Sequence, residues 1–215
     1  GYVDRVDVWK SPGSEYYRVV DYKTGKKDFD YCDVFNGVGL QMLLYLFALK
    51  KSGNSLLDEH SIPAGVQYFP ARVRYISTDG VPEPEQIEKE RQKDWKRQGL
   101  LLNDRAVLDA MEPGEEKKRL PVKEKKGELT GYLADRQQMQ LLEGYILRVL
   151  GELVEDIASG NVQPNPYTRG SSHNACRFCP YGQVCHSDSV EGRRNYKAMT
   201  AEPVSYTHLT LPTKR

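Results

Sequence analysis

Two aspartates and one lysine near the start of the chain have the residue types of a divalent-metal site. In residues 19–23, which read VVDYK, the two-residue period of a β-strand places Asp21 and Lys23 on the same face. A preceding segment carries Asp4, and a hairpin would bring its carboxylate alongside that of Asp21. Two converging carboxylates repel each other unless a cation such as Mg²⁺ lies between them. The pattern predicts a magnesium site, although Asp-x-Lys alone also fits a surface salt bridge.

The strands needed to position these side chains can be read from the same part of the sequence. Tyr2 to Trp9 alternates apolar and polar residues, and Tyr16 to Tyr22 is rich in aromatic and β-branched residues. Residues 11–14 read SPGS, which is a turn signal. We therefore predict a β-hairpin that places Asp4 beside Asp21.

Further elements are predicted downstream of the hairpin. Apolar residues recur at helical spacing between Gly37 and Lys51, which predicts a helix with a buried face. Ala64 to Ile76 predicts a third strand that is bent or interrupted at Pro70. The remaining pattern predicts an exposed helix from Glu85 to Arg97, a loop from Glu112 to Glu128, and a long helix with one apolar stripe, capped by Asp135, that runs to Ser159 and ends at Gly160.

Three short blocks occur in a characteristic order along these elements. Residues 1–7 read GYVDRVD, residues 21–25 read DYKTG, and residues 39–46 read GLQMLLYL. Here the chain resembles the PD-(D/E)xK nucleases of the RecB family, because the blocks match their GxxD, DYK and QxxxY motifs. The resemblance covers residues 1 to about 188 and implies a restriction-endonuclease-like α/β fold, with a central mixed sheet flanked by helices.

The resemblance also implies roles for five residues. Asp4 and Asp21 would bind Mg²⁺ or Mn²⁺, Lys23 would be catalytic, and Gln41 and Tyr45, one helical turn apart, would face the site. The reaction would be metal-dependent hydrolysis of DNA phosphodiester bonds. In this family a further acidic residue or His commonly comes from an upstream helix, which would precede the first residue of this chain.

Asp7 is the other carboxylate of the first strand. The strand period puts its side chain on the face opposite Asp4, where a solvated or salt-bridged carboxylate is expected, with Arg5 as a partner. We do not assign Asp7 to catalysis.

Three of the four cysteines lie within ten residues, at Cys176, Cys179 and Cys185. Clustered thiolates are typical ligands of zinc or of an iron–sulfur cluster, each of which usually takes four protein ligands. In related nucleases a similar trio binds a 4Fe-4S cluster with one cysteine upstream of the catalytic region, so the resemblance implies such a cluster with its fourth ligand before the start of this chain. Cys32 and His186 are the nearby substitutes, and Cys32 is expected to be a packing residue instead.

Cationic and aromatic residues surround the three cysteines. A mixture of this kind can hold single-stranded DNA by phosphate contacts and stacking, and we select Arg169, Arg177 and Tyr181 as candidate DNA contacts. A solvated basic surface explains the same composition equally well.

The overall composition limits the broader classes of function. Of the 215 residues 39% are hydrophobic and 28% are charged, which is typical of a soluble globular protein. With 31 basic and 30 acidic residues the net charge is +1, so DNA binding has to be local. No stretch approaches the ~20 apolar residues of a membrane span, which together with the resemblance predicts a bacterial cytoplasmic protein and no membrane partner.

The predicted organisation has three parts: a nuclease core over residues 1–160, a cluster segment over 161–203, and a tail over 204–215 that resembles translated adapter sequence. Because the chain begins without Met and on a motif residue, we expect it to be a fragment. Its spacing is most similar to the AddB-type nuclease domains of bacterial helicase–nucleases. This implies an AddA-type partner, double-stranded DNA ends and the resulting single strand as substrates, and a role in double-strand break resection and recombinational repair.

A catalytically silent DNA-binding or assembly module, stabilised by an iron–sulfur or zinc site, is the alternative from another functional class. The intact set of Asp4, Asp21 and Lys23 favours the nuclease.

Overall fold

The structure is a computed structural model, which describes residues 1–51, 56–72, 75, 80–114, 116–125, 127–163, 166–170, 174–185 and 197–198. The chain divides into two compact units. The first, called the sheet unit, comprises residues 1–29 and 39–146, and the second unit comprises residues 30–38 and 147–215. The division lies at residue 146, inside a long helix, and the domain boundary expected at residue 160 stays a prediction. The predicted foreign tail, 204–215, lies outside the described residues.

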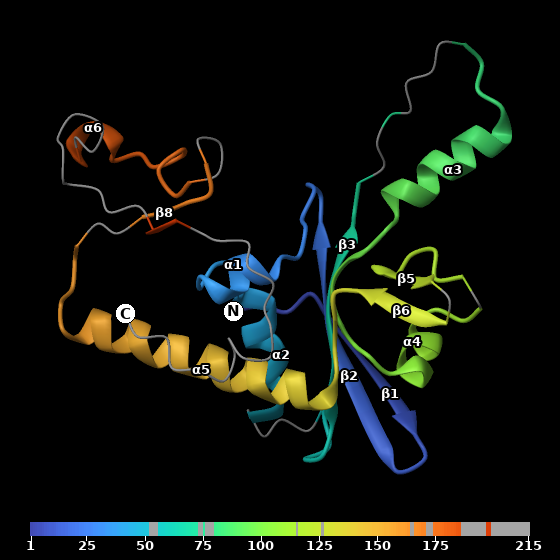
Figure 1. Ribbon diagram of the computed structural model, residues 1–215, viewed down its shortest axis with the longest axis horizontal. Helices are drawn as coiled ribbons and strands as arrows, with labels where there is room; N and C mark the ends of the chain where they lie inside the picture. The colour runs from blue at the N-terminus through green and yellow to red at the C-terminus, as the bar shows by residue number, and fades with distance from the viewer. Residues whose placement is uncertain are drawn as a thin grey trace. The chain divides into compact units, whose positions relative to one another are not determined.

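The sheet unit is built on a mixed sheet with the strand order β1-β2-β3-β4-β7. Its strands are β1 (Arg5–Ser11), β2 (Ser14–Lys23), β3 (Ile62–Pro70), β4 (Gln98–Leu102) and β7 (Leu133–Ala134). The pairs β1–β2 and β3–β4 are antiparallel, whereas β2–β3 and β4–β7 are parallel. This mixed five-stranded sheet, with helices on its faces (Figure 1), confirms the predicted fold class.

The predicted hairpin is present at the start of the chain. Ser11 pairs with Ser14, so Pro12 and Gly13 form the two-residue turn. Gly13 has φ +77°, a left-handed conformation that glycine adopts without the steric cost of a Cβ. Residues 14–23 are mostly buried, in agreement with the place of β2 between β1 and β3 in the sheet, and this interior strand carries two of the motif residues, Asp21 and Lys23.

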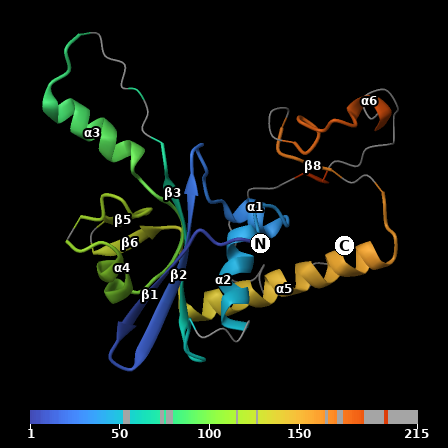
Figure 2. The same ribbon diagram turned by 180° about the vertical axis from the view of Figure 1, so that it is seen from behind.

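Helices cover both faces of the sheet (Figures 1 and 2). On one face lie α2 (Gln41–Lys51) and the first half of α5 (Arg136–Ala158). The Tyr17 hydroxyl donates a hydrogen bond to the carbonyl of Leu46, 2.9 Å away, which ties β2 to α2. On the other face α4 (Arg105–Met111) packs beside the hairpin of β5 (Val122–Lys125) and β6 (Glu128–Gly131). The helix α3 (Pro84–Asp94) projects from the sheet and buries no residue.

The β5–β6 hairpin corrects the prediction of a continuous loop from Glu112 to Glu128. The many charged residues of this segment give no alternation of apolar and polar residues that would predict a strand. In the structure, however, Leu120 and Val122 are fully buried and form a core cluster with Leu101 and Leu108. Burial of two aliphatic side chains, about 1.5–3 kcal/mol each, stabilises the segment despite its polar composition.

The long helix α5 begins as predicted at its Asp135 cap. Asp135 Oδ1 accepts a hydrogen bond from the Gln138 backbone N–H at 2.8 Å, and Gln138 Oε1 accepts one from the Asp135 backbone N–H at 2.8 Å. This is the reciprocal arrangement of a capping box. Gly160 ends the helix with φ +71°. The predicted apolar stripe is buried only in its first half, because Ile157 is 78% exposed.

The second unit contains α1 (Tyr31–Phe35), the second half of α5, β8 (Tyr167–Thr168), α6 (Gly182–Cys185) and β9 (Lys197–Ala198). Asp30 caps α1 by accepting a hydrogen bond from the Cys32 backbone N–H at 2.8 Å. Its other carboxylate oxygen lies 2.5 Å from Arg169 Nη1. This ion pair joins segments 139 residues apart in the sequence. No helix among the described residues is long and apolar enough to cross a lipid bilayer.

Asp7 lies in an arginine network on the sheet face opposite Asp21. Its carboxylate contacts Arg5 at 2.5 Å and Arg18 at 2.7 Å, and Arg18 also donates to Gln67. Burial alone would raise the pKa of Asp7, but hydrogen bonds from the two guanidinium groups outweigh it and hold the pKa below its usual value. The predicted structural role of Asp7, with Arg5 as a partner, is confirmed.

Glu15 makes the free energy of unfolding depend on pH in the acidic range. Hydrogen bonds from the Ser61 hydroxyl, from the Asp58 backbone N–H and from Lys10 lower the pKa of this buried carboxyl to about 2. A carboxyl with a lowered folded-state pKa stabilises the fold above its unfolded pKa of about 4.3, and this stabilisation is lost as the pH falls toward 2.

We predict that Glu15→Gln lowers the free energy of unfolding most above about pH 4.5, and that the difference from wild type shrinks as the pH falls from there toward about 2. Urea unfolding across this range measures the effect, with the exposed Glu59 changed to Gln as the control. Parallel pH profiles for wild type and Glu15→Gln would contradict the assignment.

Candidate functional site

Asp21 and Lys23 stand at the end of β2, on the face covered by α2. Lys23 Nζ lies 2.6 Å from Asp21 Oδ2, and the Asp21 side chain is 17% exposed while that of Lys23 is 37% exposed. Apart from this ion pair, the buried Oδ2 of Asp21 receives no hydrogen bond from the described residues. The pair therefore combines an ammonium group with a carboxylate oxygen that can accept a further ligand.

Asp4 immediately precedes β1. Arg5 pairs with Val20, so continuing the antiparallel register by one residue sets Asp4 opposite Asp21. Asp4 Oδ2 accepts a hydrogen bond from the Tyr22 backbone N–H at 3.0 Å, which fixes its carboxylate against β2. The hairpin thus brings both predicted metal ligands to neighbouring positions at one end of the sheet.

Gln41 and Tyr45 lie one turn apart at the start of α2. Gln41 Nε2 donates a hydrogen bond to Tyr45 Oη at 3.1 Å. The backbone of Gly1 lies against the Tyr45 phenol, and a Cβ at Gly1 would overlap it. The first and third motifs therefore meet in space. Neither Gln41 nor Tyr45 is hydrogen-bonded to Asp21 or Lys23 in the described part of the chain.

Tyr68 is a site residue that the sequence did not identify. On the parallel neighbour strand β3 it is paired with Asp21 and is only 7% exposed. Burial, with a contribution from the negative charge of Asp21, raises the pKa of its hydroxyl to about 12, which keeps the phenol protonated at neutral pH. Its place beside Asp21 depends on the β2–β3 register, which no local sequence signal gives.

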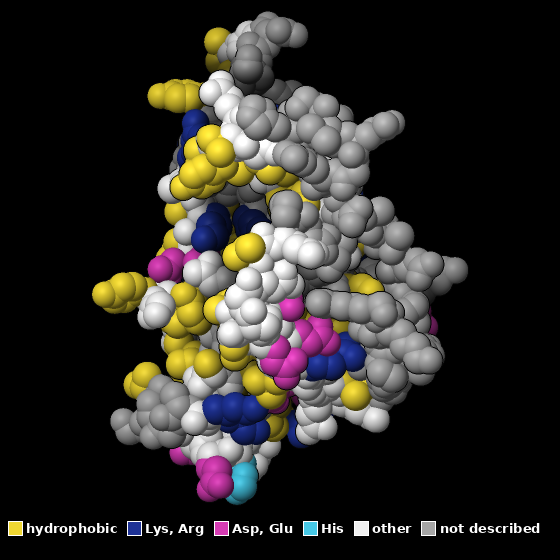
Figure 3. Space-filling model, turned by 90° about the vertical axis from the view of Figure 1, so that its left-hand side faces the viewer, with side chains coloured by type: hydrophobic (Ala, Val, Ile, Leu, Met, Phe, Trp, Pro, Cys, Tyr) yellow, Lys and Arg dark blue, Asp and Glu magenta, His cyan; other side chains and the backbone are white. Residues whose placement is uncertain are grey.

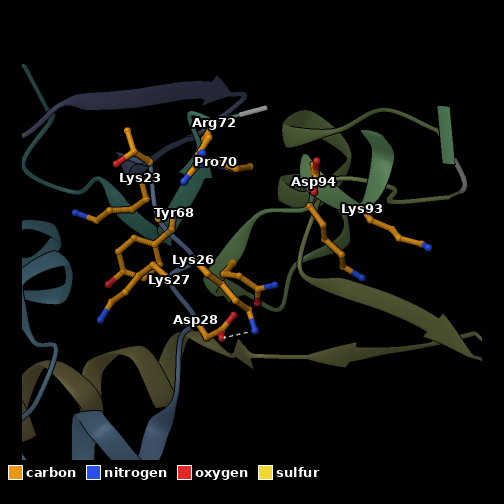
Figure 4. A pocket seen from close by; sticks show the side chains of 13 residues that line it. Lys23, Lys26, Lys27, Asp28, Tyr68, Pro70, Arg72, Lys93 and Asp94 are labelled. Carbon is orange, nitrogen blue, oxygen red and sulfur yellow. Dashed lines mark ion pairs between the residues drawn. The ribbon is translucent and has the colours of Figure 1, made fainter. Parts of the chain in front are cut away.

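A pocket of about 300 Å³ adjoins Lys23 (Figure 4). It lies between the segment that follows β2, the end of β3 and the end of α3. Tyr68 and Pro70, both labelled in Figure 4, are among the residues that line it. Six cationic side chains and two acidic ones line it: Lys23, Lys26, Lys27, Arg72, Lys93 and Lys96, with Asp28 and Asp94. This excess of positive charge favours an anionic ligand.

The excess of positive charge is local to the lining of this pocket and does not extend over the whole molecule. On the face shown in Figure 3, the described Lys and Arg side chains and the Asp and Glu side chains form separate small groups. This agrees with the balanced net charge of +1.

The carboxylate set fits a divalent cation only in part. Asp4 and Asp21 offer hard oxygen donors, and the buried Oδ2 of Asp21 accepts no hydrogen bond within the described part of the chain. Among those residues, however, no three His, Cys, Asp or Glu side chains converge as a metal-ligand group. Mg²⁺ is commonly bound by one or two carboxylates together with water and substrate phosphate oxygens, and two aspartates meet that requirement.

The three clustered cysteines lie in the second unit, Cys176 in a turn, Cys179 just after it, and Cys185 at the end of α6. Cys179 N–H donates to the Cys176 carbonyl at 3.2 Å, and Cys185 N–H donates to the Tyr181 carbonyl at 2.8 Å. None of the three is in a disulfide, and Cys179 is exposed. Three thiols are the right kind of donor for zinc or iron, but the predicted convergence of the thiolates into a ligand group is not seen among the described residues.

Cys32 has the surroundings of a packing residue. It is 5% exposed in α1, Asn36 Nδ2 lies 3.7 Å from its Sγ, and burial raises the pKa of its thiol. The other predicted substitute ligand, His186, lies outside the described residues.

The predicted DNA contacts of the second unit have different surroundings. Arg169 is engaged by Asp30 and lies 3.7 Å from Asp33, so its guanidinium serves an ion-pair network. Arg177 lies over the ring of Phe178, with 5.1 Å between the guanidinium carbon and the ring centroid. Tyr181 is 68% exposed. The Tyr181 ring is therefore accessible for stacking.

Comparison with known families gives a match that spans most of the chain. Residues 1–186 match the family model described as the PD-(D/E)XK nuclease superfamily. The match includes the hairpin, the pocket and all three clustered cysteines.

Several curated relatives are named as the B subunit of an ATP-dependent helicase/deoxyribonuclease. The protein from Clostridium kluyveri is 36% identical over 202 residues, which cover 90% of this chain and 17% of the relative. That from Acetivibrio thermocellus is 34% identical over 204 residues, covering 93% and 18%. That from Moorella thermoacetica is 36% identical over 214 residues, covering 97% and 18%. The chain therefore spans less than a fifth of the length of these relatives.

Proposed function

Because the chain belongs to the PD-(D/E)XK nuclease superfamily, we propose that Asp4, Asp21 and Lys23 form the catalytic centre of a divalent-metal-dependent DNA nuclease. The observation that carries the proposal is the Asp21–Lys23 pair at 2.6 Å, with a buried carboxylate oxygen that accepts no hydrogen bond from the described residues, at the edge of a cationic pocket. A structural salt bridge needs neither the second carboxylate at Asp4 nor that pocket.

Asp4 and Asp21 would hold Mg²⁺ or Mn²⁺ through carboxylate oxygens, with the remaining positions taken by water and a phosphate of the substrate. When bound, such a cation supplies an activated water and relieves negative charge developing on the phosphate. Asp21 holds Lys23 Nζ at the metal-binding edge, so its positive charge can neutralise the same developing charge. Gln41 and Tyr45, which hydrogen-bond to each other beside Gly1, are positioning residues for DNA or for the first motif.

The relatives carry the name of a helicase/deoxyribonuclease, which supports DNA as the substrate. On the same ground we propose that the chain serves as the nuclease domain of an AddAB-type bacterial helicase–nuclease. It would act in the cytoplasm with an AddA-type partner during double-strand break resection and recombinational repair.

The cysteine segment is proposed to bind a 4Fe-4S cluster through Cys176, Cys179 and Cys185. Three thiols that are in no disulfide and lie within ten residues of the chain support this choice. Because no group of three or more His, Cys, Asp or Glu side chains converges as a metal site in the described part of the chain, no fourth ligand is assigned. A cluster here would stabilise the second unit, since metal binding by a site absent from the unfolded chain adds to folding stability.

The test of the proposed function is Lys23→Gln in the full-length protein, with any partner chain that co-purifies. We expect cleavage of end-labelled DNA to require Mg²⁺, to stop with EDTA, and to fall about 10²–10³-fold in the variant, because one preorganised charge at the transition state is lost. Gel-resolved cleavage rates at saturating DNA measure this. The exposed Lys118 changed to Gln is the control, since it removes the same charge from a position that does not line the pocket.

Two outcomes would contradict the proposal. Wild-type protein that binds DNA but does not hydrolyse it with Mg²⁺ or Mn²⁺ would support the catalytically silent binding module. A Lys23→Gln protein that cleaves as fast as wild type would remove Lys23 from the centre.

A further inference from the structure

Three of the six cations in the pocket beside Lys23 are compensated by carboxylates. Lys23 pairs with Asp21, Lys26 Nζ lies 3.0 Å from Asp28, and the ammonium group of Lys93 contacts Glu90. Figure 4 shows the Lys93 side chain running away from Lys26 and Asp28. These three explain part of the positive lining without any ligand.

The other three cations of the pocket lining form no ion pair within the described part of the chain. They are Lys27, Arg72 and Lys96. They come from three separate segments: the one that follows β2, the one that follows β3, and the connection between α3 and β4. Three cations around one cavity of about 300 Å³ repel each other. An anion bound among them would remove that repulsion.

The lining of the pocket indicates which part of a nucleic acid would lie there. Tyr68 is only 7% exposed, and Lys27 Nζ lies 5.9 Å from the centroid of its ring. A base therefore has little aromatic surface on which to stack, whereas phosphate groups can reach the three cations. The cavity volume lies at the low end of the range for small-ligand sites, which suits a short stretch of one strand better than a duplex.

We infer that this pocket holds the phosphate backbone of a single DNA strand next to the phosphate that is cut, with Lys27, Arg72 and Lys96 as its contacts. The inference rests on the proposed function. It assigns strand binding to the sheet unit, in addition to the cysteine segment where the sequence predicted it. Backbone contacts do not read bases, so binding here is independent of sequence.

Salt dependence tests the inference with the full-length protein and any partner chain that co-purifies, single-stranded oligonucleotides of two unrelated sequences, and EDTA to prevent cleavage. For single strands the slope of log Kd against log salt concentration changes by about 0.7 per phosphate contact. We expect each of Lys27→Gln, Arg72→Gln and Lys96→Gln to reduce the slope by about 0.7, and the triple variant by about 2, equally for both sequences.

Lys89→Gln, Lys118→Gln and Lys123→Gln together are the matched control, because they also remove three charges, from exposed lysines that do not line the pocket. Circular dichroism and thermal unfolding verify that the variants are folded. If the triple variant is not folded, the slopes of the three single variants provide the test. A triple variant with the slope of the control overturns the inference, as does a wild-type chain without affinity for the oligonucleotides.

The two proposals fail separately. If the triple variant keeps the wild-type slope while wild-type protein cleaves DNA with Mg²⁺, the pocket assignment is wrong and the nuclease stands. If the slope falls as expected but Lys23→Gln leaves cleavage unchanged, the pocket binds DNA and the assigned catalytic centre is wrong.

Discussion

Replacement of Asp21 by Asn is expected to lower the rate of DNA cleavage about 10³-fold or more. Asparagine keeps the volume of the side chain but removes the charge that would hold a divalent cation and that pairs with Lys23 at 2.6 Å. Loss of metal-assisted charge stabilisation costs several kcal/mol at the transition state, and about 4 kcal/mol corresponds to about 10³-fold in rate. Cleavage rates at saturating Mg²⁺, with a Mn²⁺ titration by calorimetry, measure activity and metal affinity together.

Asp58→Asn is the control for this change. The Asp58 carboxylate is 70% exposed and its only ion-pair partner among the described residues is Lys10, at 4.0 Å. We expect wild-type rates and metal affinity from it. Wild-type cleavage by Asp21→Asn would remove Asp21 from the catalytic centre. If Asp21→Asn loses cleavage but keeps the wild-type affinity for Mn²⁺, Asp21 is not a metal ligand and its role is to hold Lys23 in place.

The relative placement of these residues could be predicted from sequence because the information for it is local. Asp21 and Lys23 are two residues apart on one strand, and the Pro12-Gly13 turn fixes the register that sets Asp4 opposite Asp21. Gln41 and Tyr45 are four residues apart on one helix. The periods of a strand and of a helix were enough to place these side chains relative to each other.

The rest of the site depends on pairings between distant segments. Tyr68 becomes a neighbour of Asp21 only through the parallel pairing of β2 with β3, and a parallel pair needs a long crossover whose register has no local signal. Lys27, Arg72 and Lys96 lie far apart in the sequence and meet only in the folded chain. Spaced in this way among 31 basic residues, they form no recognisable motif.

The strand β4 was missed for a related reason. Gly65 on β3 and Gly99 on β4 have φ of +128° and +147°, and a Cβ on either would collide with the backbone of the opposite strand. In sequence such glycines weaken a strand prediction, because glycine normally destabilises a strand interior. Here they permit a close approach of two strands that can be recognised only once both are in place.

Replacement of Cys179 by Ser tests the proposed 4Fe-4S cluster, and we expect it to lower the iron content of the protein and to destabilise the second unit. Thiolates are the protein ligands of iron–sulfur clusters, and a hydroxyl is a harder and weaker substitute. Structural metal sites contribute on the order of 10 kcal/mol of apparent binding free energy in small domains. Iron and acid-labile sulfide content, visible absorption and thermal unfolding of anaerobically purified protein measure the loss.

Cys32→Ala is the control for Cys179→Ser. It distinguishes a thiol that binds iron from a thiol that only packs in the core of this unit. Cys32 is buried in α1, and burial raises the pKa of its thiol, as expected of a packing residue. The variant should keep its iron and lose only about 1 kcal/mol of stability from the missing sulfur. Equal loss of iron from Cys32→Ala and Cys179→Ser would make Cys32 a ligand, whereas zinc in place of iron in the wild-type protein would contradict the cluster itself.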